Sequence, residues 1–371
     1  MDKKFVMGIA AMAALTLVSC SSDDLDSFSD NSSKNEAISF DGYLGRSAVA
    51  VNGTRGSVET SETLKTNGFG VFGNYSSTDS KTSDADFFKN QKVTYSTTES
   101  KWKYTPLKFW PTNGHIDFLA YAPYDVKNTT LTDGSKINNF TVSETIADQT
   151  DLLWAKATGS ISADLTSTKE KVNFHFYHAL SRLGYTVKLS GDYPSKDVTF
   201  TLKKITLAGS SDDETKGAFY RSGTIDLSKA TKDANLWSNQ TGKQKFDWFS
   251  GEYEVTRSAA SHPDINRKEN KDYLFVIPQD FSQPGEGADK LYVIVEYDVT
   301  YKSGTPTTIP NKVYKQLPIN FLQGKAYKLN LTIGLPIEFD IDVTTGVEDW
   351  TNDSDNKITD IPFDSWDDIK H

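Results

Sequence analysis

The most regular pattern in this sequence is an alternation of apolar and polar residues in its last third. In Leu291–Tyr301 every second residue is apolar or aromatic, and the opposite face becomes polar from Glu296 onward. The same alternation runs through 327–333 and 337–343. Successive side chains of a strand point to opposite faces, so each segment is predicted to be an antiparallel strand with one buried face.

Weaker versions of this pattern occur earlier in the chain. Strands are expected at 38–44, 69–75 and 115–121. The apolar face of the segment that begins at Val198 changes phase across Lys203–Lys204, which is typical of a β-bulge. Turns are expected at Ser303–Gly304, Pro306, Pro310–Asn311 and Gly324, and one short helix is possible around Ser228–Leu236.

Composition supports a mostly β protein. The chain has 21 Phe, 17 Tyr and 7 Trp, many Ser and Thr, and few long stretches at helical spacing. Its ordered part is long enough to favour two domains. A Ser-, Thr- and Ala-rich segment at 158–168 suggests a boundary near residue 170. We therefore expect an all-β protein with antiparallel β-sandwich domains at 37–170 and 171–350.

The amino terminus has the layout of a lipoprotein export signal. Lys3 and Lys4 precede an apolar run that ends in Leu17-Val18-Ser19-Cys20, which resembles a lipobox. Residues 1–19 are predicted to be a signal peptide and Cys20, the only cysteine, the lipidation site. The alternative is an ordinary signal peptide that happens to contain a cysteine. Residues 20–36 are predicted to be a flexible acidic tether.

Charge excludes one class of partner. Without residues 1–19 the chain keeps 38 basic and 49 acidic side chains, a formal charge of −11. Nucleic acid binding is therefore not expected, because no basic stripe could follow a phosphate backbone. No second apolar run approaches the length of a membrane-spanning helix.

Candidate chemistry is sparse. His175 and His178 could share one side of a helical turn, but on a strand they point to opposite faces, and no Glu or Cys lies nearby to complete a zinc site. Acyl-transfer, phosphate-loop and dinucleotide motifs are absent from the sequence. Trp102 and Trp110 could stack on sugar rings, although aromatics at strand ends more often belong to a core. We expect no metal, no cofactor and no catalytic residue.

A series of short motifs runs in order along nearly the whole chain. They are Ile38-Ser-Phe40, Thr54-Arg55-Gly56, Gly68–Phe72, Trp102–Pro111, Ile116–Tyr124, Asp151–Ala155, Phe174–Leu183, Val276–Gln279, Gly324–Tyr327 and Val347–Trp350. In this order the motifs resemble the fimbrillins, the lipoprotein-derived subunits of type V pili in Bacteroides-like bacteria. Individually they are packing and turn motifs, so they identify a fold and not a catalytic site.

The resemblance implies two tandem transthyretin-like β-sandwich domains, exported as a lipidated precursor to the outer membrane. It also implies a trypsin-like maturation protease that cuts after an arginine following the first strand. Loss of that strand opens a groove that a strand from another fimbrial subunit fills. Arg55, in a turn-like context, is favoured as the cleavage site over Arg46, which runs into an apolar segment.

The exchanged strands can also be assigned. Ile38 and Phe40 belong to the strand that is lost, and Ile358, Ile361 and Phe363 are expected in the donated one, within an extension at 351–371 that Ile337–Val343 could join. The extension could instead be a disordered acidic tail, and the protein an anchor subunit that keeps its lipid. Two rival functions remain, a monomeric surface glycan-binding lipoprotein and a β-sandwich hydrolase.

Overall fold

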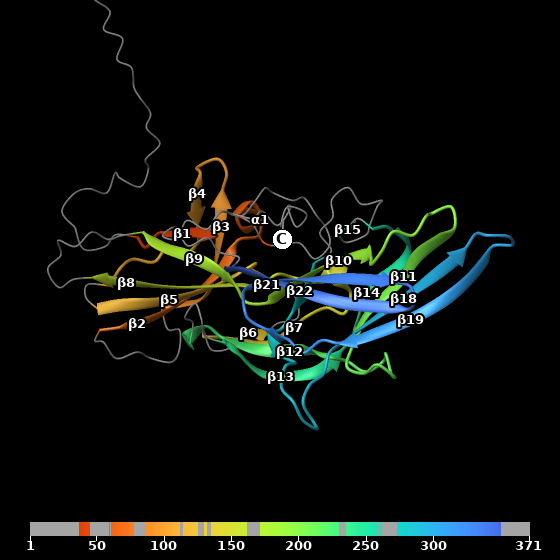
Figure 1. Cartoon of the computed structure of the whole chain (residues 1–371). Helices are drawn as coiled ribbons and strands as arrows, with labels where there is room; N and C mark the ends of the chain where they lie inside the picture. Colours follow the sequence, from red (N-terminus) through yellow and green to blue (C-terminus); the bar gives the residue numbers. More distant parts are fainter. Residues whose placement is uncertain are drawn as a thin grey trace, which may run out of the picture.

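A computed structural model of the chain describes residues 37–44, 59, 61–77, 87–111, 114–124, 130–131, 135–161, 171–229, 235–257, 260–261 and 273–349. Strands dominate these ranges, which confirms the all-β class (Figure 1). Within them the one α-helix is α1 (Ser61–Asn67), accompanied by short 3-10 turns at Ile146–Asp148 and Leu227–Lys229. None of these helices is long and apolar enough to span a membrane.

The first sheet has seven strands in the order β1-β9-β8-β5-β2-β3-β4. Their bounds are β1 (Phe40–Leu44), β2 (Phe69–Ser76), β3 (Phe88–Ser96), β4 (Lys101–Lys103), β5 (Gly114–Ala122), β8 (Leu153–Ile161) and β9 (Val172–His178). The neighbouring pairs are antiparallel except that β1 runs parallel to β9. A single bridge from Ala37 to Phe109 joins the chain before β1 to the segment after β4. The sheet therefore curls until its two edges nearly meet.

This curled sheet is apolar on both faces. Its inner face encloses one core cluster, whose large rings include Phe40, Phe69, Phe118 and Phe174. Other residues of the same strands, among them Tyr121, belong to a second and larger cluster shared with the rest of the molecule. Strand periodicity explains the division, because adjacent residues of β5 point to opposite faces.

Two further sheets lie at the other end of the molecule (Figure 1). One has the order β15-β10-β21-β22 with β16 also on β10, and the other β14-β11-β18-β19. Their bounds are β10 (Ser181–Leu189), β11 (Val198–Ala208), β14 (Phe246–Val255), β15 (Ala260–Ser261), β16 (Leu274–Val276), β18 (Tyr292–Tyr301), β19 (Thr307–Gln316), β21 (Lys325–Gly334) and β22 (Glu338–Asp349). Buried residues of both sheets share the larger core, as in a sandwich.

Two smaller sheets complete the described fold, and the first of them connects the two halves of the chain. A four-stranded sheet has the order β13-β12-β7-β6, with β6 (Thr130–Leu131), β7 (Lys136–Thr141), β12 (Phe219–Asp226) and β13 (Trp237–Gln244). A two-stranded sheet joins β17 (Gln279–Asp280) to β20 (Asn320–Phe321). The predicted boundary at residue 170 does not coincide with the sheets, because β7 pairs with β12 and β9 pairs with β8. Strand pairing thus joins segments on either side of residue 170.

Most of the predicted strands are confirmed by β1, β2, β5, β18, β21 and β22. The predicted bulge is confirmed as well, since the pairing of β11 with both of its neighbours shifts register between Leu202 and Lys204. The turn predicted at Pro310–Asn311 is wrong, because Pro310 pairs with Asp298 inside β19. An edge strand tolerates a proline since one side of its backbone needs no partner.

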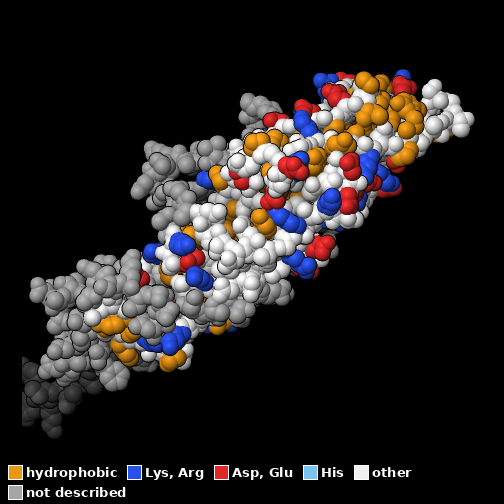
Figure 2. Space-filling view, turned by 90° about the horizontal axis from the view of Figure 1, so that it is seen from below, with side chains coloured by type: hydrophobic (Ala, Val, Ile, Leu, Met, Phe, Trp, Pro, Cys, Tyr) orange, Lys and Arg blue, Asp and Glu red, His pale blue; other side chains and the backbone are white. Residues whose placement is uncertain are grey.

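One other expectation is corrected. Ile337–Val343 does not lie free for donation, because β22 starts at Glu338 and pairs with β21 along nearly its whole length. Ile337 itself precedes β22 and is exposed. Other exposed large apolar residues lie on the β18–β19 hairpin, at Tyr301, Ile309 and Tyr314. Figure 2 shows apolar side chains gathered toward that end of the molecule.

Candidate functional site: strand β1 and its slot in the first sheet

Strand β1 is buried on one face, although it precedes the rest of the first sheet by a long stretch of sequence. Ile38, Phe40 and Leu44 are almost completely buried, at 1%, 3% and 1% exposure. They alternate with the exposed Ser39 and the half-buried Asp41. This period-two pattern places the apolar residues of β1 in the inner core of the curled sheet.

Phe40 is the central contact of this strand. Its ring lies 5.2 Å from the ring of Tyr104, 5.4 Å from Phe88, 5.6 Å from Phe118 and 5.7 Å from Phe174, measured between centroids. The pairs with Phe88 and Phe118 are edge-to-face, a geometry that adds to the free energy of burial. The four rings come from other strands of the sheet and from the segment after β4, so Phe40 ties both edges together.

Gly42 leaves space for two of the core rings. A Cβ atom at this position would lie 2.9 Å from Cε1 of Phe69 and 3.4 Å from Cε2 of Phe176. The first distance is shorter than real Cβ contacts, so any larger residue must move the Phe69 ring. The slot that β1 fills is therefore apolar at positions 38, 40 and 44 and narrow at position 42.

The two sides of β1 are held differently. On one side a parallel ladder pairs Phe40 with Val172 and continues to Leu44. On the other side the Ile38 N–H donates to the Lys108 carbonyl oxygen at 2.8 Å, and the Tyr104 hydroxyl donates to the Ile38 carbonyl oxygen at 2.7 Å. Burial raises the pKa of Tyr104, which keeps the phenol protonated as a donor. The second side is a clasp of a few bonds and not a full ladder.

The chain is anchored again at Glu59, before α1. Its backbone N–H donates to Asp151 Oδ2 at 2.9 Å, and its carboxylate accepts from the Thr63 hydroxyl and the Asn67 amide at 2.7 and 2.8 Å. Asp151 also contacts Nδ1 of the buried His178 at 2.9–3.0 Å. Burial, and next to it the charge of Asp151, raises the pKa of Glu59 to about 7. Glu59 is thus fastened to Asp151 and α1, and the nearby Ser61 hydroxyl donates to the Leu44 carbonyl oxygen of β1 at 2.9 Å.

Of the predicted site residues, Ile38 and Phe40 are brought together with the core as just described. Cys20, Arg46 and Arg55 lie outside the described residues, as do Ile358, Ile361 and Phe363 of the carboxy-terminal extension. Sequence reasoning missed Tyr104 and Glu59. Tyr104 lies within the Trp102–Pro111 motif, whereas nothing in the sequence marks Glu59.

The candidate histidines and tryptophans serve in packing. On β9 the His175 ring stacks on Tyr177 with centroids 4.6 Å apart, whereas His178 is buried against Asp151. Among the described residues no group of three His, Cys, Asp or Glu side chains could hold a metal ion. Trp110 is buried against Phe118, and Trp102 lies 4.8 Å from the Phe69 ring, so both belong to the inner core.

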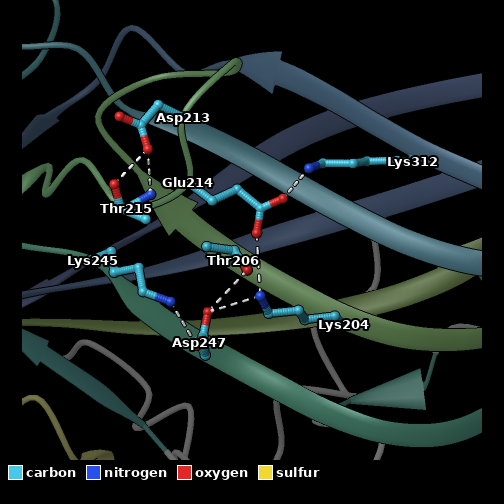
Figure 3. Close-up of polar contacts among 8 residues, drawn as sticks. All are labelled: Lys204, Thr206, Asp213, Glu214, Thr215, Lys245, Asp247 and Lys312. Atoms are coloured by element: carbon cyan, nitrogen blue, oxygen red, sulfur yellow. Dashed lines mark hydrogen bonds and ion pairs between the residues drawn. The ribbon is translucent and has the colours of Figure 1, made fainter.

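Glu214 and Asp247 form a carboxylate cluster with three lysines. Glu214 lies 3.2 Å from Lys204 Nζ and also pairs with Lys312, and Asp247 lies 3.4 Å from Lys204 and 2.7 Å from Lys245 (Figure 3). The bond from Lys312 lowers the pKa of Glu214. A glycosidase needs one carboxyl with a raised pKa to act as an acid. The lysines hold this cluster ionised, so it serves to fasten β19 and the 210–216 loop to β11 and β14.

Comparison with known proteins gives the family. A family model described as fimbrillin-like matches residues 54–350. The chain therefore belongs to the fimbrillin-like family. It is 27% identical over 381 residues to the fimbrium subunit Fim1C of Phocaeicola vulgatus, covering 94% of this chain and 97% of that protein. This confirms the resemblance inferred from the ordered motifs.

A solved structure shares the fold of this fimbrillin-like chain. A fimbrial protein from Bacteroides vulgatus superposes with a TM-score of 0.58 at 22% identity, over 85% of this chain and 99% of that one. At this identity the likeness concerns the fold alone. The motifs that carried the resemblance supply the core around the β1 slot, including Phe174, Phe118 and Tyr104.

Proposed function

We propose that this fimbrillin-like chain is the precursor of a structural subunit of a surface fimbria that serves adhesion. It is exported through residues 1–19, lipidated at Cys20 and delivered to the outer membrane. A trypsin-like protease then cuts after Arg55, or alternatively Arg46, and β1 leaves. A strand from another fimbrial subunit fills the slot. The observation that carries this proposal is the β1 slot, which is apolar, deep and closed on one side only by the Tyr104 clasp.

The position of the arginines supports the cut. Both lie between Leu44, where β1 ends, and Glu59, where the chain is fastened again. Cleavage at either one separates β1 from the remaining fold without breaking a described strand. The match to the family model starts at residue 54, next to Arg55, and leaves out β1. Arg55 remains the favoured site.

The consequence of losing β1 follows from its contacts. Without Phe40, the rings of Phe88, Phe118 and Phe174 face an open slot, and β9 presents an unpaired edge. An open apolar edge associates with other strands. Head-to-tail insertion of a strand is a heterologous contact, so it builds open filaments and not closed rings. This role agrees with the similarity of the chain to a fimbrium subunit and to a fimbrial protein.

A direct test treats the lipid-free mature chain with limiting trypsin and follows its mass and oligomeric state over days. A cut after Arg55 followed by ladders on a native gel is expected, and Arg55→Ala should remove both unless the cut moves to Arg46. Full resistance together with tight binding to a glycan would favour the glycan-binding lipoprotein instead. Incorporation of labelled palmitate into the precursor, lost in Cys20→Ala, tests the lipid step separately.

A further inference from the structure

One edge of the first sheet is basic, although the chain as a whole is acidic. Residues 87–111, from β3 to the segment after β4, contain five lysines and one glutamate, whereas the whole chain has a formal charge of −10. Lys101 and Lys103 are exposed on β4 and both pair with Glu99. Two lysines therefore share one carboxylate, and this edge keeps a positive charge.

Exposed apolar side chains continue the same edge. Trp102 and Tyr104 turn inward, whereas the alternate positions 101, 103, 105, 107 and 109 are exposed. The last two of these are Leu107 and Phe109, at 46% and 48% exposure. Large apolar side chains close together and bordered by charge are typical of a contact surface. Lys101, Lys103, Leu107 and Phe109 are called the β4 surface below.

The edge strand β22 has the complementary composition. Residues 335–349 contain five acidic residues and no basic one. Glu338, Asp340 and Asp342 are exposed and, as alternate residues of one strand, share a face of β22. Asp340 pairs with Lys315, whereas Glu338 and Asp342 make no ion pair with the described residues. Ile337, directly before them, is 65% exposed. These four residues, Ile337, Glu338, Asp340 and Asp342, are called the β22 surface.

We propose that the β4 surface of one copy of this chain binds the β22 surface of a second copy. This inference rests on the proposed function, in which subunits assemble, and adds a contact outside the β1 slot. The lysines of one copy face the carboxylates of the other, and Leu107 and Phe109 cover Ile337. An identical chain is the partner because both halves of this complementary pair belong to one sequence.

The position of the two surfaces makes the contact repeat. β4 is at an edge of the first sheet, and β22 is at an edge of the sheet that contains β10 and β21 (Figure 1). A copy that uses its β22 surface on one neighbour keeps its β4 surface for another, so the contact is heterologous and extends a chain of subunits. Acidic copies repel each other elsewhere, and the contact thus selects one relative orientation. Exposed ion pairs are weak, so it guides assembly and does not hold a polymer alone.

Carbodiimide cross-linking of the natural surfaces locates the contact. This reagent joins a lysine to a carboxylate only where the two touch. Isotope-labelled and unlabelled copies of the uncut, lipid-free mature chain are mixed at high concentration, so that peptides of mixed label report contacts between copies. Mass spectrometry is expected to find mixed-label peptides that join the β4 surface to the β22 surface, and to lose them in about 0.5 M salt. Glu286 and Lys290, which are also exposed, are the internal control and should give none.

Charge reversal tests the pairing itself. One variant carries Lys101→Glu and Lys103→Glu, and the other carries Glu338→Lys and Asp342→Lys. Each variant alone brings like charges together, so its association constant, from sedimentation equilibrium at low salt, should fall by about 10-fold or more. An equimolar mixture of the two should associate as the natural chain does, because opposite charges meet again at every contact. Thermal unfolding checks that both variants remain folded.

The results separate this inference from the function on which it rests. Mixed-label peptides between other segments only, or no loss of association in either variant, would overturn the contact and leave cleavage and strand exchange standing. Same-label peptides alone between the two surfaces would overturn the second-copy partner. A salt-sensitive contact between copies that never form ladders after trypsin treatment would support the contact and overturn the proposed assembly. Lys290→Glu with Glu286→Lys is the matched control, and an equal loss there would overturn the assignment to these surfaces.

Discussion

The hydroxyl of Tyr104 donates a hydrogen bond of 2.7 Å to the carbonyl oxygen of Ile38. The two residues are 66 positions apart in the sequence, and their bond lies where the edges of the first sheet meet. On the other side of β1 the backbone ladder supplies a series of bonds. Tyr104 therefore holds the weaker side of the strand.

Removal of this hydroxyl should loosen β1 without emptying the core. Tyr104→Phe keeps the ring against Phe40 but leaves the buried Ile38 carbonyl without this donor, which costs about 1–2 kcal/mol. Hydrogen exchange of the amides around Ile38–Phe40 should become faster, and the urea midpoint should fall. Tyr314→Phe, at a residue that is 55% exposed, is the control and should change neither. Unchanged exchange in Tyr104→Phe would contradict the clasp.

Truncation of Phe40 tests the central ring contact. Phe40→Ala in the uncut chain should lower the free energy of unfolding by about 3–5 kcal/mol, because it removes a buried ring and leaves a cavity. Phe109→Ala is the matched control, since this ring is 48% exposed and lies beside the same seam. Urea unfolding followed by tryptophan fluorescence measures both. Similar losses in the two variants would argue against a buried Phe40.

Enlargement at Gly42 tests the narrow point of the slot. Gly42→Val drives a side chain into the Phe69 and Phe176 rings, so we expect a loss of about 1–3 kcal/mol from overpacking. Ser39→Val adds similar bulk on the exposed side of the same segment and should be nearly neutral. Thermal unfolding of the uncut chains distinguishes the two. A neutral Gly42→Val would mean that the slot is wider than the structure shows.

The buried Glu59 carboxyl predicts a pH dependence of stability. Its pKa is raised to about 7 in the folded state, mainly by burial, so the folded chain holds a proton that the unfolded chain releases near 4.5. Stability from this group is complete below about pH 4.5 and is lost as the pH rises through 7. The full difference is at most about 3 kcal/mol. Burial lowers the pKa of the neighbouring His178, so the folded chain binds a proton there less readily than the unfolded chain. This histidine therefore lowers stability as the pH falls below 6.5, the ordinary pKa of His.

Glu59→Gln should remove the Glu59 part of this dependence. The variant keeps acceptor and donor atoms near Thr63 and Asn67 but no longer titrates. The free energy of unfolding, measured in urea, should therefore fall more between pH 5 and pH 8 in the natural chain than in Glu59→Gln. Glu62→Gln is the control, because Glu62 is exposed on α1. Parallel pH profiles for all three proteins would contradict a buried, titrating Glu59.

Local pattern was enough to predict individual strands. The alternation at 291–301 predicted β18, and the phase change at Lys203–Lys204 predicted the bulge of β11. Both features depend on side chains within one strand, which periodicity records directly. The prediction of a turn at Pro310 failed because proline also suits an edge strand, and edge position depends on the whole sheet.

The local pattern of apolar and polar residues could not predict which distant strands pair. No local signal places β7 beside β12 or β9 beside β1, because those choices depend on which distant apolar faces match. The clasp was missed for the same reason, since Tyr104 acts through a hydroxyl bond to a distant carbonyl. Glu59 likewise acts through Asp151, 92 positions away. Ile38 and Phe40 were found because their alternation and motif are local.

The ladder between β1 and β9 has a consequence for the order of folding. β1 is synthesised before the other described strands, yet Phe40 pairs with Val172, so the chain between them must be made before this contact exists. Closing so long a loop is slow and comes after local hairpins. The inner core is thus sealed late, by a strand attached through a continuous chain. Under the proposed cleavage the same contact would become a bimolecular one, so dilution would weaken the binding of β1 that the covalent linkage favours.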